Sequence, residues 1–534
     1  MTKDRPETSR TALAVLAIAA LAAVLLVHPA CGRRAPALKH VIFFIGDGMS
    51  AQTEVAASRY LYGTDDGLAW QKFPGKAYVA TWDVNVYNGN ARKARRPPYS
   101  RSSFTPLLGY DVKVEGPRPH TDQDATDPFL PGPATDSASA ATALATGFKT
   151  DSGNISWLSG DPPDGELVTI AEEYRAKTGA GIGVISTVPF DHATPAAFVS
   201  HNTSRNSYYT GRRGYKDLGI ADEIILRVKP DVVIGGGHPL LDNPDFNPKT
   251  GYISEALYLG LKTSPDYLLV ERTAGGDGGR AVIEGAAAAF RVGKKLFGLF
   301  GGKGGNFEVP LAEDSPGSPL VKPATEENPS LAEATLAALD YLGRNPDGFF
   351  LVVEQGDIDW TNHDNDFRGM IGCVDDLDEA VRAATAFVDR PGDALDWTNT
   401  VLLVTADHAT GGLFLDRGKR LGPGDLPRQD PRIADPENSP VAGSDRGIAS
   451  NGTGLKAPAY SSLNMFPDEE VVYGTAGHTN ELVDLAVAGA AVRYFMKYRG
   501  TWYPGLVLDN TQINAALREA LGLSALGRRA ARGS

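Results

Sequence analysis

The feature that most constrains the fold is a repeated alternation of short apolar runs with helical stretches along most of the chain. The apolar runs are rich in β-branched and aromatic residues and are nearly continuous, which is typical of strands buried on both faces of a sheet. They lie at Val41–Ile45, Ile182–Ser186, Asp231–Ile234, Leu296–Phe300, Phe349–Glu354 and Thr400–Thr405.

Helical patterns lie between and after these runs. Ala138–Thr146 is Ala-rich and ends at Gly147, a residue suited to a helix C-cap. Ile371–Val388 places apolar residues at three- and four-residue spacing, and Leu331–Leu342 and Thr511–Leu521 also read as helices. The alternation predicts an α/β protein, a three-layer α/β/α sandwich with a large, mostly parallel central sheet and surface insertions.

The composition indicates a large folded domain and argues against one class of binding partner, nucleic acids. The 534 residues are 42% hydrophobic, which is enough for a sizeable core. The net charge of −13 argues against general nucleic-acid binding, because no basic surplus exists to neutralise phosphates. The negative net charge does not exclude small phosphorylated substrates, because local cations or metal ions can outweigh it at a binding site.

The N-terminus has the pattern of an export signal. Lys3, Arg5 and Arg10 precede the apolar run Thr11–Val27, which predicts an exported protein that is periplasmic, secreted or anchored to the cell envelope. The run is also near the lower length limit of a membrane span. Cys31 directly follows it and suggests a lipid anchor. Cleavage, a lipid anchor and a transmembrane anchor stay open as alternatives.

We expect one large domain after this N-terminal export signal. Residues 1–37 form the signal or anchor with a short linker, residues 38–527 the domain, and residues 528–534 a disordered tail. Two insertions, at about 85–133 and 416–468, show no sustained periodicity and are expected to be loops. The basic run Arg92–Arg101 reads as a solvated surface, with an anion-attracting patch as the alternative. Cys373 lies in an apolar helical stripe and is expected in the core.

Carboxylates and histidines follow the predicted strands. Ligands of open α/β sheets bind outside the carboxyl ends of the strands. One acidic residue there is often only a helix N-cap, but caps do not account for so many such places in one chain. The residues are Asp47, Asp191, His192, Thr194, Glu354, Asp359, His363, Asp407, His408 and His478.

These residue types are metal ligands. Oxygen and imidazole donors together suit Zn²⁺, whereas Asp, Glu and Thr with water suit Mg²⁺. Asp359 and His363 are four residues apart and so share one helical face or tight turn. Carboxylates this crowded repel one another unless cations lie between them, and the ligands suffice for two or three metals.

A serine and an arginine complete the candidate chemistry. Ser137 lies at the first turn of the predicted helix Ala138–Thr146, where backbone N–H groups favour anions. The alternative is that Asp136 or Ser137 is only an N-cap. Arg205 carries a guanidinium, the natural bidentate partner of phosphate oxygens, although it can also be an ordinary surface arginine.

Six segments together resemble the alkaline phosphatase family. They occur in the order found in that family and span most of the chain. They are VIFFIGDGM (Val41–Met49), TDSASAATALATGFKT (Thr135–Thr150), HATPAAFVSHNTSR (His192–Arg205), FFLVVEQGDIDWTNH (Phe349–His363), LLVTADHATGG (Leu402–Gly412) and TAGHTNEL (Thr475–Leu482).

The resemblance implies a phosphate-monoester hydrolase that works through a phosphoserine and releases inorganic phosphate and an alcohol. Ser137 would be the nucleophile and Arg205 would hold phosphoryl oxygens. Two Zn²⁺ and one Mg²⁺ are implied per chain. The first zinc would take Asp359, His363 and His478; the second would take Asp47, Asp407 and His408, beside Ser137; and magnesium would take Asp47, Thr194 and Glu354.

Two positions depart from the enterobacterial form of the family. His192 stands where that form has Asp, and Trp360 stands where it has Lys. An imidazole near the third metal could favour Zn²⁺ or Co²⁺ there over Mg²⁺. The insertion at 416–468 lies where some members build a crown over a dimer, so a homodimer is the expectation by analogy.

Two other functions stay open. A phosphodiesterase or nucleotide pyrophosphatase of the same superfamily would share the two-zinc core, but Ser137, Arg205, Thr194 and Glu354 favour a monoesterase. An inactive phosphate- or metal-binding protein could also have this fold. A sulfatase is excluded, because Ser137 is not followed by the Pro and Arg that such enzymes need.

Overall fold

A computed structural model describes residues 38–110, 133–210, 218–239, 251–392, 394–416, 421–428, 466 and 470–525. The chain divides into Met1–Ala37 and the compact unit Leu38–Ser534. The predicted export segment at 11–27 and the tail at 528–534 lie outside the described residues. Within the described part, no helix is both long and apolar enough to span a membrane.

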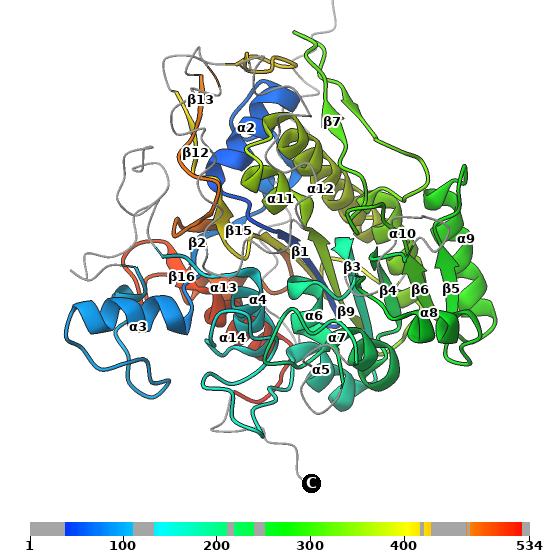
Figure 1. Ribbon diagram of the computed structural model, residues 1–534, viewed down its shortest axis with the longest axis horizontal. Coiled ribbons are helices and arrows are strands. Elements are labelled where there is room, and N and C mark those ends of the chain that lie inside the picture. Colours follow the sequence, from blue (N-terminus) through cyan, green and yellow to red (C-terminus); the bar gives the residue numbers. More distant parts are fainter. Residues whose placement is uncertain are drawn as a thin grey trace, which may run out of the picture. The chain divides into compact units, whose positions relative to one another are not determined.

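A ten-stranded sheet forms the centre of this unit, in the order β16-β2-β15-β10-β1-β9-β3-β4-β6-β5 (Figure 1). Only β15 runs antiparallel to its neighbours β10 and β2. The strands are β1 His40–Gly46, β2 Gly75–Ala80, β3 Gly181–Pro189, β4 Val232–Gly236, β5 Tyr267–Glu271, β6 Lys295–Leu299, β9 Phe349–Gln355, β10 Thr400–Thr405, β15 Val483–Gly489 and β16 Val507–Asp509.

Helices cover both faces of the sheet. On one face α9, α10, α12 and α2 pack against one another, and on the other α4, α5, α6, α13 and α14 do so (Figure 1). The helices are α2 Ala51–Tyr62, α3 Val84–Lys93, α4 Ser137–Thr146, α5 Ile170–Thr178, α6 Ala193–Val199, α7 Ile220–Asp222, α8 Glu255–Lys262, α9 Gly278–Arg291, α10 Leu331–Leu342, α11 Asp357–His363, α12 Phe367–Val388, α13 Val492–Met496 and α14 Asn510–Ala520.

Three short two-stranded ladders lie outside the central sheet. They are β7 Leu311–Ala312 with β8 Val321–Lys322, β11 Ala409–Thr410 with β14 His478–Thr479, and β12 Leu413–Leu415 with β13 Val471–Tyr473.

The predicted α/β class with a large, mostly parallel sheet is confirmed, and each predicted strand overlaps an observed one. The strands β1, β9 and β10, whose apolar runs are unbroken, are buried at every residue. The sequence did not reveal β2, β5, β15 and β16. In β2 and β5 buried residues are mixed with half-buried ones, and β16 has only three residues.

The register of the central strands places their carboxyl ends side by side. Ile45 of β1 pairs with both Glu354 of β9 and Thr405 of β10. Glu354 also pairs with Ser186 of β3. The segments that leave these four strands therefore start from one edge of the sheet, as expected for a ligand site in an open α/β fold.

The first predicted insertion is a folded element in its described part, so the expectation of a loop is wrong there. Residues 84–93 form α3, which begins at the N-cap Asp83, whose side chain accepts from Val86 N. Trp82 packs against Tyr87, Tyr99 and Phe104 at ring-centroid distances of 5.3, 5.8 and 5.9 Å. Widely spaced aromatic residues form this small core, so no regular period marked it in the sequence.

Other local expectations can be compared directly. Cys373 is fully buried in α12, as expected. Gly147 ends α4 in the left-handed conformation, with φ of 75°, as a C-cap glycine should. Residues 111–132 and most of the second insertion, 417–420, 429–465 and 467–469, lie outside the described residues.

Candidate active site at the strand ends

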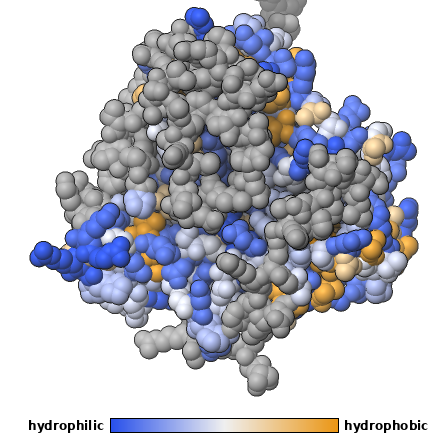
Figure 2. All heavy atoms as spheres, in the orientation of Figure 1, coloured by the Kyte–Doolittle hydropathy of each residue, from blue (hydrophilic) through white to orange (hydrophobic). Residues whose placement is uncertain are grey.

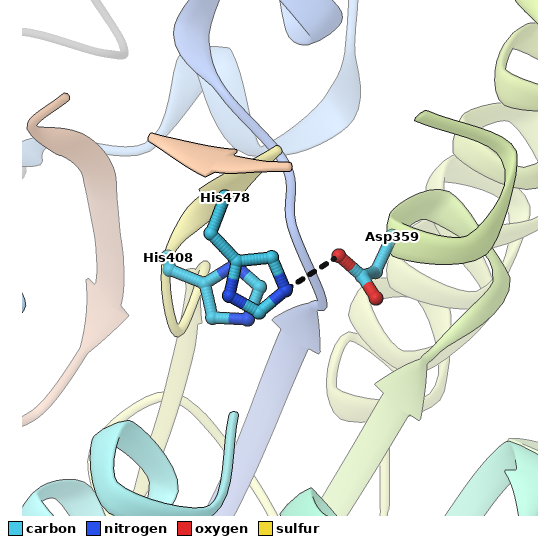
Figure 3. Close-up of side chains that lie close together, drawn as sticks. All are labelled: Asp359, His408 and His478. Atoms are coloured by element: carbon cyan, nitrogen blue, oxygen red, sulfur yellow. Dashed lines mark ion pairs between the residues drawn. The ribbon is translucent and has the colours of Figure 1, made fainter. Parts of the chain in front are cut away.

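One cluster of candidate ligands joins α11 to the segments after β10 and β13. Asp359 Oδ1 lies 3.3 Å from His363 Nε2 and 3.5 Å from His478 Nε2. The two histidine Nε2 atoms are 3.1 Å apart. Figure 3 shows Asp359 pointing toward His478, with the His408 ring stacked on the His478 ring at 3.7 Å between centroids. The structure thus brings together the three residues expected at the first metal.

A second cluster lies next to the first, where β1 and β10 end. His408 Nε2 is 3.2 Å from Asp47 Oδ1 and 3.3 Å from Asp407 Oδ2. All three residues are buried, and their ligand atoms are close enough to share one ion. Asp359, His408 and His478 form a similar group, so His408 lies between the two clusters.

Contacts at Nδ1 fix the orientation of the histidine rings. His363 Nδ1 lies 2.6 Å from Ala476 O, and His478 Nδ1 lies 2.8 Å from Thr135 O. Because a carbonyl oxygen only accepts, each Nδ1 carries a proton and each Nε2 faces Asp359. Both Nε2 atoms are therefore positioned where they could bind a metal ion together with Asp359. Burial alone would lower the pKa of His363, but the charge of Asp359 outweighs it and raises that pKa.

Ser137 lies between the second cluster and the start of α4. Its Oγ is 3.1 Å from His408 Nε2 and 3.5 Å from Asp47 Oδ1, and the residue is buried. Asp136 caps the helix through Ser139 N, so Ser137 is the first helical residue. Both interpretations of this segment therefore apply: Asp136 is an N-cap, and Ser137 faces the ligand cluster from an anion-favouring helix terminus.

Arg205 is a buried site residue and not a surface arginine. Its Nη1 donates to Asp136 Oδ2 at 3.0 Å, and its Nη2 is 3.4 Å from His192 Nε2. Burial alone would raise the pKa of Asp136, but Arg205 and the hydrogen bonds from Ser139 and Gly153 outweigh it and lower that pKa to about 2. Sequence reasoning treated Asp136 only as a cap, although its place directly before Ser137 was a signal for a second role.

The residues expected at the third metal gather where β3 and β9 end. Glu354 accepts from Ser186 Oγ, a contact that sequence reasoning missed. Thr194 lies close enough to lower the pKa of Glu354, but burial dominates and raises that pKa to about 8. His192 packs edge-on against Trp360 at 5.7 Å, and burial followed by the charge of Arg205 lowers its pKa to about 3.

The electrostatics of the site fit bound cations. Burial, and then the charges of Asp407, Asp359 and Glu354, raise the pKa of Asp47 well above its usual range. Burial lowers the pKa of His408 to about 4 and that of His478 to about 3, so both rings are neutral at neutral pH. Asp47 Oδ2 and Glu354 Oε1 are buried and have no hydrogen-bond donor among the described residues. Divalent metal ions bind to carboxylate oxygens and to neutral imidazole nitrogens. Buried carboxylate oxygens that receive no hydrogen bond are therefore suited to a bound metal ion.

The fold and this buried carboxylate–histidine cluster define an α/β protein with a candidate metal centre at the carboxyl ends of its strands. Comparison with known families gives a more specific result: the family model described as alkaline phosphatase matches residues 119–425. The chain therefore belongs to the alkaline phosphatase family.

Curated relatives agree with this assignment. The chain is 32% identical to alkaline phosphatase 4 of Bacillus subtilis over 286 residues, 53% of this chain and 50% of the relative. It is 32% identical to the alkaline phosphatase of Escherichia coli K12 over 386 residues, 70% of each chain. A streptomycin-6-phosphate phosphatase of Streptomyces griseus is 29% identical over 407 residues, 72% of this chain and 76% of the relative. The match thus spans about half the length of the Bacillus relative and more of the other two.

Solved structures share the fold. The alkaline phosphatase of Thermus thermophilus superimposes with a TM-score of 0.56 at 22% identity, covering 93% of both chains. The cold-active enzyme of a Shewanella species gives a TM-score of 0.55 at 23% identity, covering 90% of this chain and 99% of its own.

Proposed function

We propose that this protein is an alkaline phosphatase that hydrolyses phosphate monoesters through a phosphoserine at Ser137, releasing inorganic phosphate and an alcohol. The observation that carries the proposal is the position of Ser137. Its Oγ lies 3.1 Å from His408 Nε2 at the start of α4, beside a guanidinium that Asp136 holds in place.

In this proposal the chain's own residues bind and orient the phosphoryl group. The free N–H groups at the first turn of α4 and the guanidinium of Arg205 favour the negative oxygens of the phosphate. Ser137 Oγ attacks phosphorus, its P–O bond forms as the ester P–O bond breaks, and the alcohol leaves. Water then cleaves the phosphoserine and restores the hydroxyl.

We assign two Zn²⁺ and one Mg²⁺ to the site. The first zinc is assigned to Asp359, His363 and His478, the second to Asp47, Asp407 and His408, and magnesium to Asp47, Thr194 and Glu354. Bound ions there supply charge stabilisation for the serine oxygen and the leaving oxygen. The neutral imidazole of His192 lies beside the third set, so Zn²⁺ or Co²⁺ could replace Mg²⁺ there.

A comparison of two esters tests the proposal. The chain from Leu38 onward forms a compact unit and would be assayed with p-nitrophenyl phosphate and bis-p-nitrophenyl phosphate at alkaline pH. Zn²⁺ and Mg²⁺ would be present, with a chelator as control. We expect fast, chelator-sensitive monoester turnover and a weak diester rate. A dominant diester rate would instead indicate a phosphodiesterase, and metal binding with no turnover would indicate an inactive binding protein.

We further propose that the protein is exported and acts as a homodimer on small phosphorylated substrates. The basic and apolar N-terminus supports export. The insertion at 416–468, where some family members build a crown over a dimer, supports the homodimer by analogy. Cell fractionation, mass spectrometry of the mature N-terminus and light scattering of the purified protein test these points. A cytoplasmic protein with an intact N-terminus, or a monomeric mass, would contradict them.

A further inference from the structure

A cavity lies away from the strand ends, between the segment after α3, the end of α4 and helix α14. Its volume is about 470 Å³, within the range of small-molecule sites. Half of its lining residues are aromatic or cationic, among them Tyr99, Arg101, Phe104, Lys149, Trp502 and Arg518. The carboxylate in the lining, Glu519, is paired with Lys497.

The aromatic side of this cavity is held in place by ring–ring contacts. Phe104 meets Trp502 edge-on at 5.2 Å and 82°, and it meets Tyr99 at 5.3 Å. Trp502 is nevertheless 37% exposed, an unusual position for the largest apolar side chain. Figure 2 shows a hydrophobic area beside the hydrophilic surface of α3, close to where Figure 1 places β16. A fixed, partly exposed aromatic surface is suited to stacking against a planar ring.

Of the three cationic side chains that line the cavity, two have a carboxylate partner within the described part of the chain and one does not. Lys149 Nζ lies 3.2 Å from Asp509, and Arg518 Nη2 donates to both carboxylate oxygens of Glu173 at 2.8 and 2.7 Å. Arg101 has no carboxylate partner among the described residues and stacks on the Phe148 ring at 3.7 Å. Its charge is therefore uncompensated at a cavity wall, in a protein whose net charge is −13.

A second cationic side chain, Arg518, lines the same cavity as Arg101. Burial, and in smaller part the charge of Arg518, lower the pKa of Arg101. Arg518 is itself buried, and its Nη1 has no hydrogen-bond acceptor among the described residues. An anion between the two guanidiniums would relieve both conditions.

We propose that this cavity is a second, non-catalytic site for a planar aromatic anion, with the ring stacked on Trp502 next to Phe104 and the anionic group on Arg101. The basic run 92–101 had two interpretations, and for Arg101 the anion site is the one that the cavity supports. Gly147 lines the cavity at the end of α4, whereas Ser137 is at its start. A helix of ten residues is about 15 Å long, so the two sites are separate. The inference does not rest on the proposed function.

Calorimetric titration of the full chain with 1-naphthalenesulfonate tests the proposal. Methanesulfonate lacks the ring and 1-naphthalenemethanol lacks the charge, so each is expected to bind at least about tenfold more weakly. Arg101→Gln and Trp502→Ala are each expected to weaken naphthalenesulfonate binding about tenfold or more. Arg92→Gln removes an exposed charge from α3, outside the cavity, and is the matched control. It should leave the affinity within about twofold, the range expected for a distant surface change.

Phosphate-ester turnover, measured on the same preparations, should be equal in all three variants and the parent, because none of these residues lies at the strand ends. No detectable binding to the parent protein would overturn the proposal. Equal binding of the sulfonate and the alcohol, or an affinity unaffected by Arg101→Gln, would also overturn it, because the site would then not select an anion.

Discussion

Ser137 Oγ lies 3.1 Å from His408 Nε2, although 271 positions separate the two residues in the chain. The pair is not part of a serine–histidine–carboxylate triad. His408 Nδ1 faces Thr410 Oγ1 at 3.3 Å, where a triad would place a carboxylate. The carboxylates of Asp47 and Asp407 lie instead on the Nε2 side, next to the serine. Within the proposed function, this arrangement fits activation of Ser137 by a metal ion and not by a histidine base.

Removing the Ser137 hydroxyl should abolish turnover without unfolding the protein. Ser137→Ala is expected to lower the rate with p-nitrophenyl phosphate by at least about 10³-fold, because the nucleophile is lost. Zinc content and melting temperature should stay close to those of the parent protein. A variant that keeps more than about a tenth of the rate would show that Ser137 is not the nucleophile.

Arg205 should act through the geometry of its guanidinium as well as through its charge. Arg205→Lys keeps the charge but cannot hold Asp136 and a phosphoryl group with a planar fork. We expect kcat/KM to fall about 10- to 100-fold and the inhibition constant of inorganic phosphate to rise. Arg175→Lys is the control, because Arg175 pairs with Asp231, which precedes β4 at the opposite end of the strands. Equal effects of the two substitutions would contradict a role of Arg205 in phosphate binding.

Gly48 makes room for Asp359, a ligand in the proposed metal site. Its φ is +68°, and a Cβ there would lie 2.7 Å from Thr410 Oγ1 and 2.8 Å from Asp359 Oδ1. Gly48→Ala should cost about 1–2 kcal/mol of backbone strain and displace Asp359. Zinc affinity, measured by competition with a chelator, should fall about 10- to 100-fold.

Gly89 in α3 is the control for that substitution, because a Cβ there meets no atom within 4 Å. Gly89→Ala should leave zinc affinity unchanged and stabilise the helix by about 0.5–1 kcal/mol. Unchanged zinc affinity in Gly48→Ala would mean that Asp359 tolerates the added methyl group.

His201 should make stability fall at high pH. Its Nδ1 lies 2.8 Å from Glu223 and its Nε2 lies 3.1 Å from Glu172, and Arg227 also pairs with Glu223. Burial would lower the pKa of His201, but the two carboxylates outweigh it and raise that pKa to about 10 from the ordinary 6.5. Because the folded protein holds this proton more tightly, the stabilisation is complete below pH 6.5 and is lost as pH rises through about 10.

Thermal melts of His201→Gln should therefore show a pH-dependent difference from the parent protein. We expect a loss of about 3–5 kcal/mol near pH 6, as for a broken buried ion pair, and a smaller difference above pH 10. His238→Gln is the control, because burial lowers the pKa of His238 and its removal should produce no alkaline trend. A constant difference across this range would show that His201 is neutral in the folded protein.

The local pattern predicted the elements that are buried on both sides. The apolar runs of β1, β9 and β10 have no polar interruption, so their strand character is visible without a partner. The reversed strand β15 and its neighbour β2 were missed, because half-buried residues weaken their pattern and strand direction depends on distant chain segments.

The sequence by itself determined the α/β class and the residue types at the strand ends, because burial and strand periodicity are local properties of the chain. The resemblance to a family implied that Asp47, Asp407 and His408 meet beside Ser137, and the tertiary structure brings them together there. Only the tertiary structure decided that Asp136 holds Arg205. It also decided that Arg101 faces a cavity with Trp502. These relationships depend on strand order and register, which are set by packing between segments hundreds of residues apart and not by any local pattern.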